Sequence, residues 1–453
     1  SFKGLLCLDL AALEDPKKRF VLIEAKACVW ATGGPACLYR DSVFPGSQHG
    51  ASGVAFAAGV QGKNLTEWQY GLASVKPRWN DSGTYMQVLP RFISVDEDGA
   101  EHEFLFEHFD LYDALNLVFL KGYQWPFDVT KSKDGSSQID LLVHEETKRG
   151  RRVYLDFRSN PQGLEELDFS KLSSEARDYL ETTGACFGTP IERLQHMNEP
   201  AIEFYLDHNV DLRKERLEIA LCAQHNNGGL DVDENWMTNV PGLYAVGEVA
   251  GTHGVFRPGG SALNAGQVGG LRAAMHLSLQ DYQFTAIEAT DYQDIIDEVE
   301  QALNRAATSS ESFVELQMAL TRQMSEVAAA IRNLTAMQDL LTKVKRALKT
   351  DYAIPNPQLL PAYFRSRDLL MTMKVYLTAF CDYRETGGVS RGSALYLGDA
   401  KALTVDPQAI QLVDISGKIE RRAVRPIPEP AESFENIWRE SRQKDAKRRE
   451  LYT

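Results

Sequence analysis

The sequence lacks the features of several large classes of protein. No apolar run approaches the ~20 residues that cross a bilayer as a helix. Lys and Arg (49) are outnumbered by Asp and Glu (63), and the net charge of −14 argues against a nucleic-acid binder. The six cysteines form no Cys-x-x-Cys pair, so we expect no metal or iron–sulfur site in this chain and a reducing, cytoplasmic environment.

Familiar catalytic motifs are absent as well. There is no Gly-x-Ser-x-Gly elbow, His-Glu-x-x-His pair or Walker loop, so hydrolase, zincin and nucleotide-triphosphatase activities lack support. The first residues are neither a secretory signal nor a start at Met. We therefore expect a fragment, or a chain that lacks an N-terminal portion.

Two glycine-rich turns, Ala223–Leu230 and Gly251–Ser261, contain the strongest functional signal. They carry His225, His253 and Arg257, and the apolar segment Val240–Val249 runs between them. Glycines let a backbone approach a ligand closely, and an arginine fork binds a carboxylate. This combination predicts an active site in which His225 and Arg257 bind an anionic substrate, although a lone His or Arg in a loop is more often structural.

Three further segments are candidates for binding a cofactor. Val21–Gly34 reads as one buried strand that ends in the turn Thr32–Gly34, although Thr-Gly-Gly also makes ordinary turns. Glu248 ends an apolar strand and can accept bonds from ribose hydroxyls, with a helix cap or a surface acid as the alternative. The turn Gly259–Gly266 leads into a helix, whose first amides favour negative charge.

The pattern of elements predicts a mixed α/β fold. Gly50–Gly59 reads as a small-residue helix packed close to a sheet or ligand, and Gly266–Met275 as another close-packed helix. Phe92–Gly99 reads as a strand followed by an Asp-Gly turn. The expected domains are residues 1–66 (cofactor-binding, N-terminal part missing), 67–219 (inserted), 220–280 (return to the first domain) and 281–453 (helical, with an irregular tail).

An apolar stripe predicts helices in the C-terminal part of the chain. The stripe comprises Leu320, Met324, Val327, Ile331, Leu334, Leu341, Val344 and Leu348. Bundle packing is favoured over a coiled coil because Gln338 and Lys345 interrupt the heptad. A further helix is expected over Asp368–Phe380, and irregular structure beyond Arg391. We expect a proline-rich link over 426–430, and we interpret the tail 438–449 as a solvated helix, with partner binding as the alternative.

The ordered motifs resemble those of the fumarate reductase/succinate dehydrogenase flavoprotein family, which includes L-aspartate oxidase. The resemblance rests on His225–Gly229, on Val240–Glu248 and on His253–Arg257. Weaker agreement comes from Glu67–Gln69 and from Arg384–Gly392, which is similar to the family's Arg-x-Glu-Ser-Arg-Gly with an insertion. The likeness covers most of the chain, thinly in the inserted domain.

The resemblance implies a Rossmann-like FAD-binding domain, an inserted capping domain and a C-terminal helical domain. It implies hydride transfer between flavin N5 and a carbon–carbon bond beside a substrate carboxylate held by His225 and Arg257. It also implies an iron–sulfur or cytochrome partner, which would place the protein at a membrane only through that partner. The implied FAD-binding residues are Thr32, Gly33, Gly34, Gln69, Gly247, Glu248, His253, Gly260, Ser261 and Leu263.

Three departures from the family pattern bear on the substrate. The Gly-x-Gly-x-x-Gly turn that cradles the FAD pyrophosphate is missing, and Gly71 stands where the family has a carboxylate-binding histidine. The segment Leu120–Asp128 replaces the region of the proton-shuttling arginine and holds no arginine. We expect Lys121, ahead of Tyr123, to donate the proton, with an exposed structural lysine as an equally good interpretation of Lys121. A monocarboxylate or a larger substrate, such as an aromatic enoate, then fits better than fumarate.

Two alternative functions stay open. One is an amino-acid oxidase of the aspartate-oxidase kind. The other is a non-catalytic flavoprotein-like subunit, which the missing dinucleotide turn supports.

Overall fold

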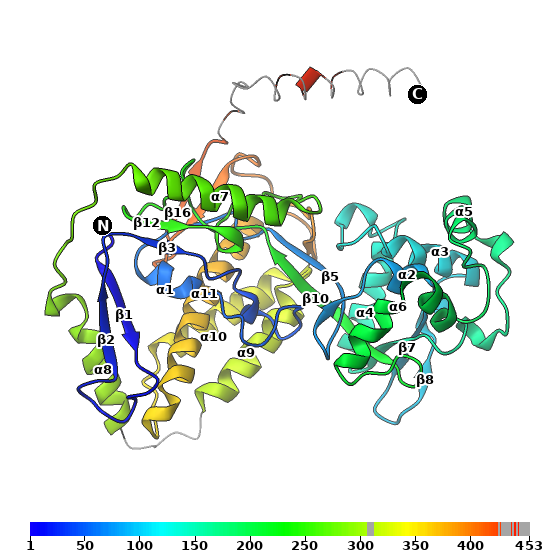
Figure 1. Cartoon of the computed structure of the whole chain (residues 1–453), viewed down its shortest axis with the longest axis horizontal. Helices are drawn as coiled ribbons and strands as arrows, with labels where there is room; N and C mark the ends of the chain where they lie inside the picture. The colour runs from blue at the N-terminus through cyan, green and yellow to red at the C-terminus, as the bar shows by residue number, and fades with distance from the viewer. Residues whose placement is uncertain (306–311, 425, 427–435, 437–438, 441–442, 444–453) are drawn as a thin grey trace.

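Two lobes, joined by a pair of long strands, make up the protein (Figure 1). The computed structural model describes residues 1–305, 312–424, 426, 436, 439–440 and 443. The connecting strands are β5 (Trp68–Ser74) and β10 (Leu217–Asn226), which pair antiparallel and place His225 opposite Gln69. A β-bulge between Ala223 and His225 shifts the register just before the glycine-rich turn.

The inserted lobe surrounds one six-stranded sheet of order β6-β5-β10-β9-β7-β8. Its helices and strands are β6 (Trp79–Asn80), α2 (Thr84–Gln87), β7 (Arg91–Val95), β8 (Glu101–His102), α3 (Leu111–Lys121), α4 (Ser137–Lys148), β9 (Arg152–Asp156), α5 (Ser174–Thr182) and α6 (Pro190–Asp207). The predicted strand at Phe92 with its Asp-Gly turn is confirmed, because β7 and β8 form an antiparallel hairpin. Buried Phe92, Leu155 and Leu217 belong to one core beneath the helices.

The segment Val21–Gly34 is not the single buried strand that the sequence predicts. It forms β2 (Phe20–Glu24) and β3 (Cys28–Trp30), separated at Ala25–Ala27. β2 pairs with β1 (Gly4–Leu8) in an exposed two-stranded ribbon, and β3 pairs in parallel with β12 (Leu243–Ala245). The apolar run therefore serves two sheets, a change of direction that hydrophobicity alone does not reveal.

Both small-residue helices are confirmed, as α1 (Ser52–Ala57) and α7 (Ser261–Ser278). Helix α11 (Leu360–Glu385) is the main neighbour of α1. A Cβ at Gly53 would lie 2.1 Å from the carbonyl oxygen of Asp368 in α11. Glycine at position 53 is thus required for the close approach of these two helices.

The C-terminal apolar stripe belongs to two helices. These are α9 (Phe313–Val327) and α10 (Leu334–Lys349), with the short strand β13 (Ile331–Arg332) between them. Their buried residues share one core with α11, so the bundle interpretation is confirmed. The helix α8 (Gln293–Asn304) packs in a separate small cluster.

The sequence predicts irregular structure beyond Arg391, and this prediction is wrong. The segment contains β14 (Leu395–Tyr396), β15 (Ile410–Val413) and β16 (Ile419–Arg422). β15 pairs with β4 (Gly62–Lys63), which also pairs with β11 (Gly229–Leu230), so the end of the chain returns to the first lobe. The predicted link at 426–430 and tail at 438–449 fall almost entirely outside the described residues. Within those residues no helix has the length and apolar character needed to cross a membrane.

Candidate functional site

The loops that follow β3 and β12 meet where these two parallel strands end side by side. Thr32–Gly34 follow β3, and Gly247 and Glu248 follow β12. Gly33 and Gly247 have φ of 76° and 77°, a conformation that favours glycine. A Cβ at Gly34 would lie only 2.5 Å from Glu248 Oε1, so the absence of a side chain lets the two loops touch.

Glu248 lies within this junction rather than at the surface. Its Oε1 accepts a hydrogen bond from the backbone N–H of Asn226 at 2.7 Å, which ties the end of β12 to the end of β10. Burial raises the pKa of Glu248 to about 7, and the bond from Asn226 opposes that rise. The carboxyl group therefore titrates near neutral pH.

The first turn of α7 lies uncapped near the same junction. Its N-cap residue Gly260 has a φ of 77° and offers no side chain to the first amides. Ser261 donates its hydroxyl to the carbonyl oxygen of Pro258 at 2.7 Å instead. No atom lies within 4 Å of a Cβ built at Gly260, and Leu263 is 76% exposed. The free amides and the helix dipole thus face open space, which suits an anion or an electron-rich ring.

Buried polar atoms without partners support a bound group at this place. In the described part of the chain, the hydroxyl oxygens of Thr32 and Thr252 are buried and make no hydrogen bond. A buried hydroxyl normally has a partner, because leaving it unpaired costs about 1–3 kcal/mol. Together with the glycine turns and the uncapped helix, these hydroxyls fit a flat cofactor that bears hydroxyl and phosphate groups.

His225 is held in one orientation at the end of β10. Asn227 donates to the carbonyl oxygen of Val255 at 3.4 Å, which turns its Oδ1 toward His225 Nδ1 at 2.9 Å. Nδ1 therefore carries the proton, an assignment made from the hydrogen-bond network. Nε2 is left as a buried lone pair with no partner in the part of the chain that the structure describes.

His253 packs edge-on against His225, with 4.7 Å between the ring centroids. Burial, reinforced by Arg257, lowers the pKa of His225 to about 3 and that of His253 to about 4. Both imidazoles are therefore neutral at pH 7.

Gln69 fixes Arg257 at the site. Arg257 Nε donates to Gln69 Oε1 at 2.8 Å, and Gln69 Nε2 donates back to the carbonyl oxygen of Arg257 at 3.1 Å. This reciprocal pair uses Nε of the guanidinium, and Nη1 donates to the carbonyl oxygen of Pro258 at 3.4 Å. Nη2 makes no hydrogen bond within the described residues. Gln69, which the sequence predicts as a cofactor-binding residue, contacts Arg257 in this structure.

A cavity of about 400 Å³ opens at Arg257 between the two lobes. It is lined by Gln69, Trp125, Pro126, Phe127, Asp128, Lys131, Val255, Phe256, Arg257, Pro258, Gly392 and Ser393. The main chain closes one side, because Phe127 N donates to Tyr70 O at 2.7 Å and Val129 N donates to Gly392 O at 2.9 Å. The structure thus brings the predicted Gln69 and Arg257 together with a segment of the inserted lobe. The sequence indicated Trp125 only as one of several aromatics that could line the pocket, and it did not indicate Lys131.

Lys121, predicted as the proton donor, is not among the residues that line this cavity. Its side chain is 1% exposed and lies 2.7 Å from Asp140, whose side chain is fully buried. Burial raises the pKa of Asp140, and Lys121 opposes the rise. Tyr123 contacts Glu175 and is largely exposed. Neither residue reaches Arg257, because α3 ends inside the inserted lobe.

An aromatic ring fills the space beside Gly71. A Cβ at position 71 would lie 2.4 Å from Trp125 Nε1 and 3.2 Å from Gln224 Nε2. The place of the family's histidine is therefore filled by the indole of Trp125. From the sequence, Gly71 indicates only that the histidine side chain is missing. Which residue fills the space depends on the packing of the inserted lobe.

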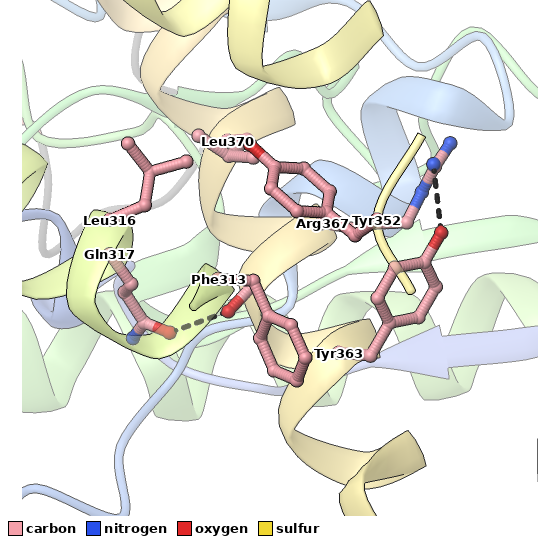
Figure 2. A pocket seen from close by; sticks show the side chains of 8 residues that line it. Phe313, Leu316, Gln317, Tyr352, Tyr363, Arg367 and Leu370 are labelled. Atoms are coloured by element: carbon pink, nitrogen blue, oxygen red, sulfur yellow. Dashed lines mark hydrogen bonds between the residues drawn. The ribbon is translucent and has the colours of Figure 1, made fainter. Parts of the chain in front are cut away.

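A second pocket lies between α9 and α11 and is too small for a ligand. It encloses about 10 Å³ and is lined by Phe313, Leu316, Gln317, Tyr352, Tyr363, Ser366, Arg367 and Leu370. Figure 2 shows these side chains packed against one another, with Ser366 donating to Gln317 at 2.8 Å. The volume is about that of a single water molecule.

Comparison with known proteins places the chain among flavoproteins. The profile of a family described as "FAD binding domain" matches residues 9–263. One chain of a fumarate reductase (CoM/CoB) from Methanothermobacter marburgensis is 31% identical over 161 residues, which are 34% of this chain and 29% of that protein. An L-aspartate oxidase from Yersinia pestis is 35% identical over 251 residues, 53% of this chain and 37% of that protein.

The structural comparison supports the same fold. A quinol fumarate reductase chain from E. coli superposes with a TM-score of 0.61 at 20% identity, over 95% of this chain and 70% of that one. The predicted architecture of a cofactor-binding domain, an inserted capping domain and a helical domain is therefore confirmed. The matched segments span less than half the length of the two curated relatives.

Proposed function

The chain belongs to the FAD binding domain family, and we propose from this premise that it is a flavin-dependent oxidoreductase acting on a carbon–carbon bond beside a carboxylate. Thr32–Gly34, Gly247, Glu248 and the first turn of α7 would hold the FAD. The cofactor, when bound, supplies the site that gives or takes a hydride. The observation that carries the proposal is the cationic Arg257 between this cradle and a cavity of about 400 Å³.

The side chains of the site would orient and polarise the substrate. Arg257, fixed by Gln69, binds one carboxylate through its free N–H groups. Drawing electron density into that carboxylate favours hydride addition to a conjugated alkene. His225 Nε2 has no partner in the described chain. Its lone pair would accept a hydrogen bond from a protonated substrate group or from a water molecule. His253 closes the space beside His225.

The test is reoxidation of the reduced flavin. The chain is loaded with FAD, reduced with dithionite and mixed with a panel of enoates that includes fumarate, crotonate and cinnamate. Oxidation by an enoate, lost in Arg257→Gln, supports the proposal. If flavin binds and no enoate, quinone or oxygen reoxidises it, the proposal is wrong. Gln195→Leu, on an exposed part of α6, is the matched control.

A second candidate is an amino-acid oxidase. The observation that favours it is the buried His225 Nε2, which has no partner in the described residues and can accept a hydrogen bond from a substrate ammonium group. The likeness to the L-aspartate oxidase of Yersinia pestis also supports it. Hydrogen peroxide released with an amino acid, and no reoxidation by enoates, would favour this activity over the first. In either case, an iron–sulfur or cytochrome protein as electron partner is part of the proposal.

A further inference from the structure

The segment 125–131 supplies five of the twelve residues that line the cavity at Arg257. Five of its residues line that space: Trp125, Pro126, Phe127, Asp128 and Lys131. The segment is fastened to the first lobe through Tyr70 and Gly392, and Ser393 donates its hydroxyl to the carbonyl oxygen of Phe127. These bonds hold the lining in place without a ligand, so the shape of the cavity carries information about what it binds.

The indole of Trp125 lies on the same face of β5 as the pair that holds Arg257. Gln69 and Gly71 are two residues apart on this strand, and alternate residues of a strand share a face. Trp125 Nε1 would lie 2.4 Å from a Cβ at position 71, so the indole covers that part of the face. A ligand anchored at Arg257 therefore extends along a flat aromatic surface, and no side chain at position 71 is available to bind its other end.

A second cation, Lys131, lines the same cavity. Lys131 ends the 3-10 helix η3 (Val129–Lys131), and its ammonium has neither a hydrogen bond nor an ion pair within the described residues. The acidic lining residue, Asp128, does not pair with it. Asp128 Oδ1 accepts bonds from the backbone N–H and the hydroxyl of Thr130, at 2.9 and 2.8 Å, and so caps its own helix.

We propose that the substrate carries a second anionic group bound by Lys131, at the far end of a flat unsaturated or aromatic part that lies along Trp125. Arg257 and Lys131 would then bind the two ends of an elongated dianion, longer than a C4-dicarboxylate. The inference rests on the proposed function, since it names the substrate class of the same site. Of the two substrate types that the sequence allows, a monocarboxylate and a larger compound, the proposal favours a larger compound with two negative charges.

The test compares two ligands that differ by one carboxylate. Binding of cinnamate and of 4-carboxycinnamate to the FAD-loaded full chain is measured by calorimetry. We expect 4-carboxycinnamate to bind about tenfold tighter, a factor that corresponds to about 1.4 kcal/mol. Lys131→Gln should bring the ratio close to one, and Lys131→Arg should keep most of it. The exposed Lys133, which does not line the cavity, provides the control Lys133→Gln.

Each result decides the inference. Equal binding of both compounds by the wild type, no binding of either, or a ratio that Lys131→Gln leaves unchanged would overturn it. Because binding is measured without turnover, a failure of this inference is distinct from a failure of the proposed function, which shows as a flavin that no substrate reoxidises.

Discussion

Gln69 and Arg257 hold each other through two hydrogen bonds, one from side chain to side chain at 2.8 Å and one from side chain to backbone at 3.1 Å. The two residues are 188 positions apart in the sequence. The pair fixes both the guanidinium and the loop that carries it, so the direction of the Arg257 side chain is determined by the strand that joins the two lobes.

Loss of this pair should weaken substrate binding more than catalysis. We expect Gln69→Leu to raise KM for the carboxylate substrate about tenfold, since a hydrogen bond to a charged group contributes about 1.5–3 kcal/mol. The change in kcat should be smaller, because Arg257 remains present but is less well placed. Steady-state kinetics of Gln69→Leu and Gln195→Leu would measure the difference, and an unchanged KM would contradict the role of Gln69.

The neutral histidines should make stability fall as the pH drops. Their folded pKa values, about 3 and 4, lie below the usual 6.5, so between these limits the unfolded chain binds more protons. The free energy of unfolding should then decrease by up to about 1.4 kcal/mol per pH unit for each group below pH 6.5. Urea unfolding at pH 7 and pH 5 should show a smaller loss in His225→Asn than in the wild type. The exposed His208→Asn is the control.

Glu248 should act in the opposite sense. Its folded pKa of about 7 lies above the ordinary 4.5, so the folded chain binds more protons between these values and stability falls as the pH rises through them. Glu248→Gln keeps an acceptor for Asn226 and removes the titration. We expect the variant to gain stability relative to the wild type at pH 8 and to match it at pH 4.5. Equal pH profiles would contradict the raised pKa.

A side chain at position 34 should damage the cofactor cradle. In Gly34→Ala the Cβ would lie 2.5 Å from Glu248 Oε1, so the carboxylate or the loop must move. We expect FAD to bind at least about tenfold more weakly, with little loss of secondary structure, as measured by flavin fluorescence and circular dichroism. Gly46→Ala is the control, because no atom lies within 4 Å of a Cβ there.

Lys121 should prove structural. Lys121→Met leaves Asp140 buried without its cation, which typically costs about 3–5 kcal/mol. The double variant Lys121→Met with Asp140→Leu removes both charges and should recover most of that stability. If the double variant also keeps kcat, measured on the substrate found in the reoxidation panel, Lys121 does not donate the proton. A folded double variant without turnover would restore the prediction made from the sequence.

The sequence predicted the parts of the site that depend on local backbone, and missed those that depend on distant contacts. The glycine turns at Thr32–Gly34 and before Ser261 follow from residue type alone, and both helices of small residues formed where expected. The prediction of a single strand from Val21 was wrong because hydrophobicity does not show where a chain changes its partner strand. Lys131 was missed because its place beside Arg257 depends on how the inserted lobe packs.

The bonds of Phe127 to Tyr70 and of Val129 to Gly392 also limit how the molecule can admit a ligand. Rotation of the inserted lobe about β5 and β10 would have to break both, together with the bond from Ser393. In the loop that Arg257 attaches to β5 through Gln69, the side chain of Phe256 is exposed and makes no such hydrogen bond within the described residues. Admission of a ligand should therefore be gated by a few residues of that loop, and its rate should respond to changes at Phe256 rather than to the hinge strands.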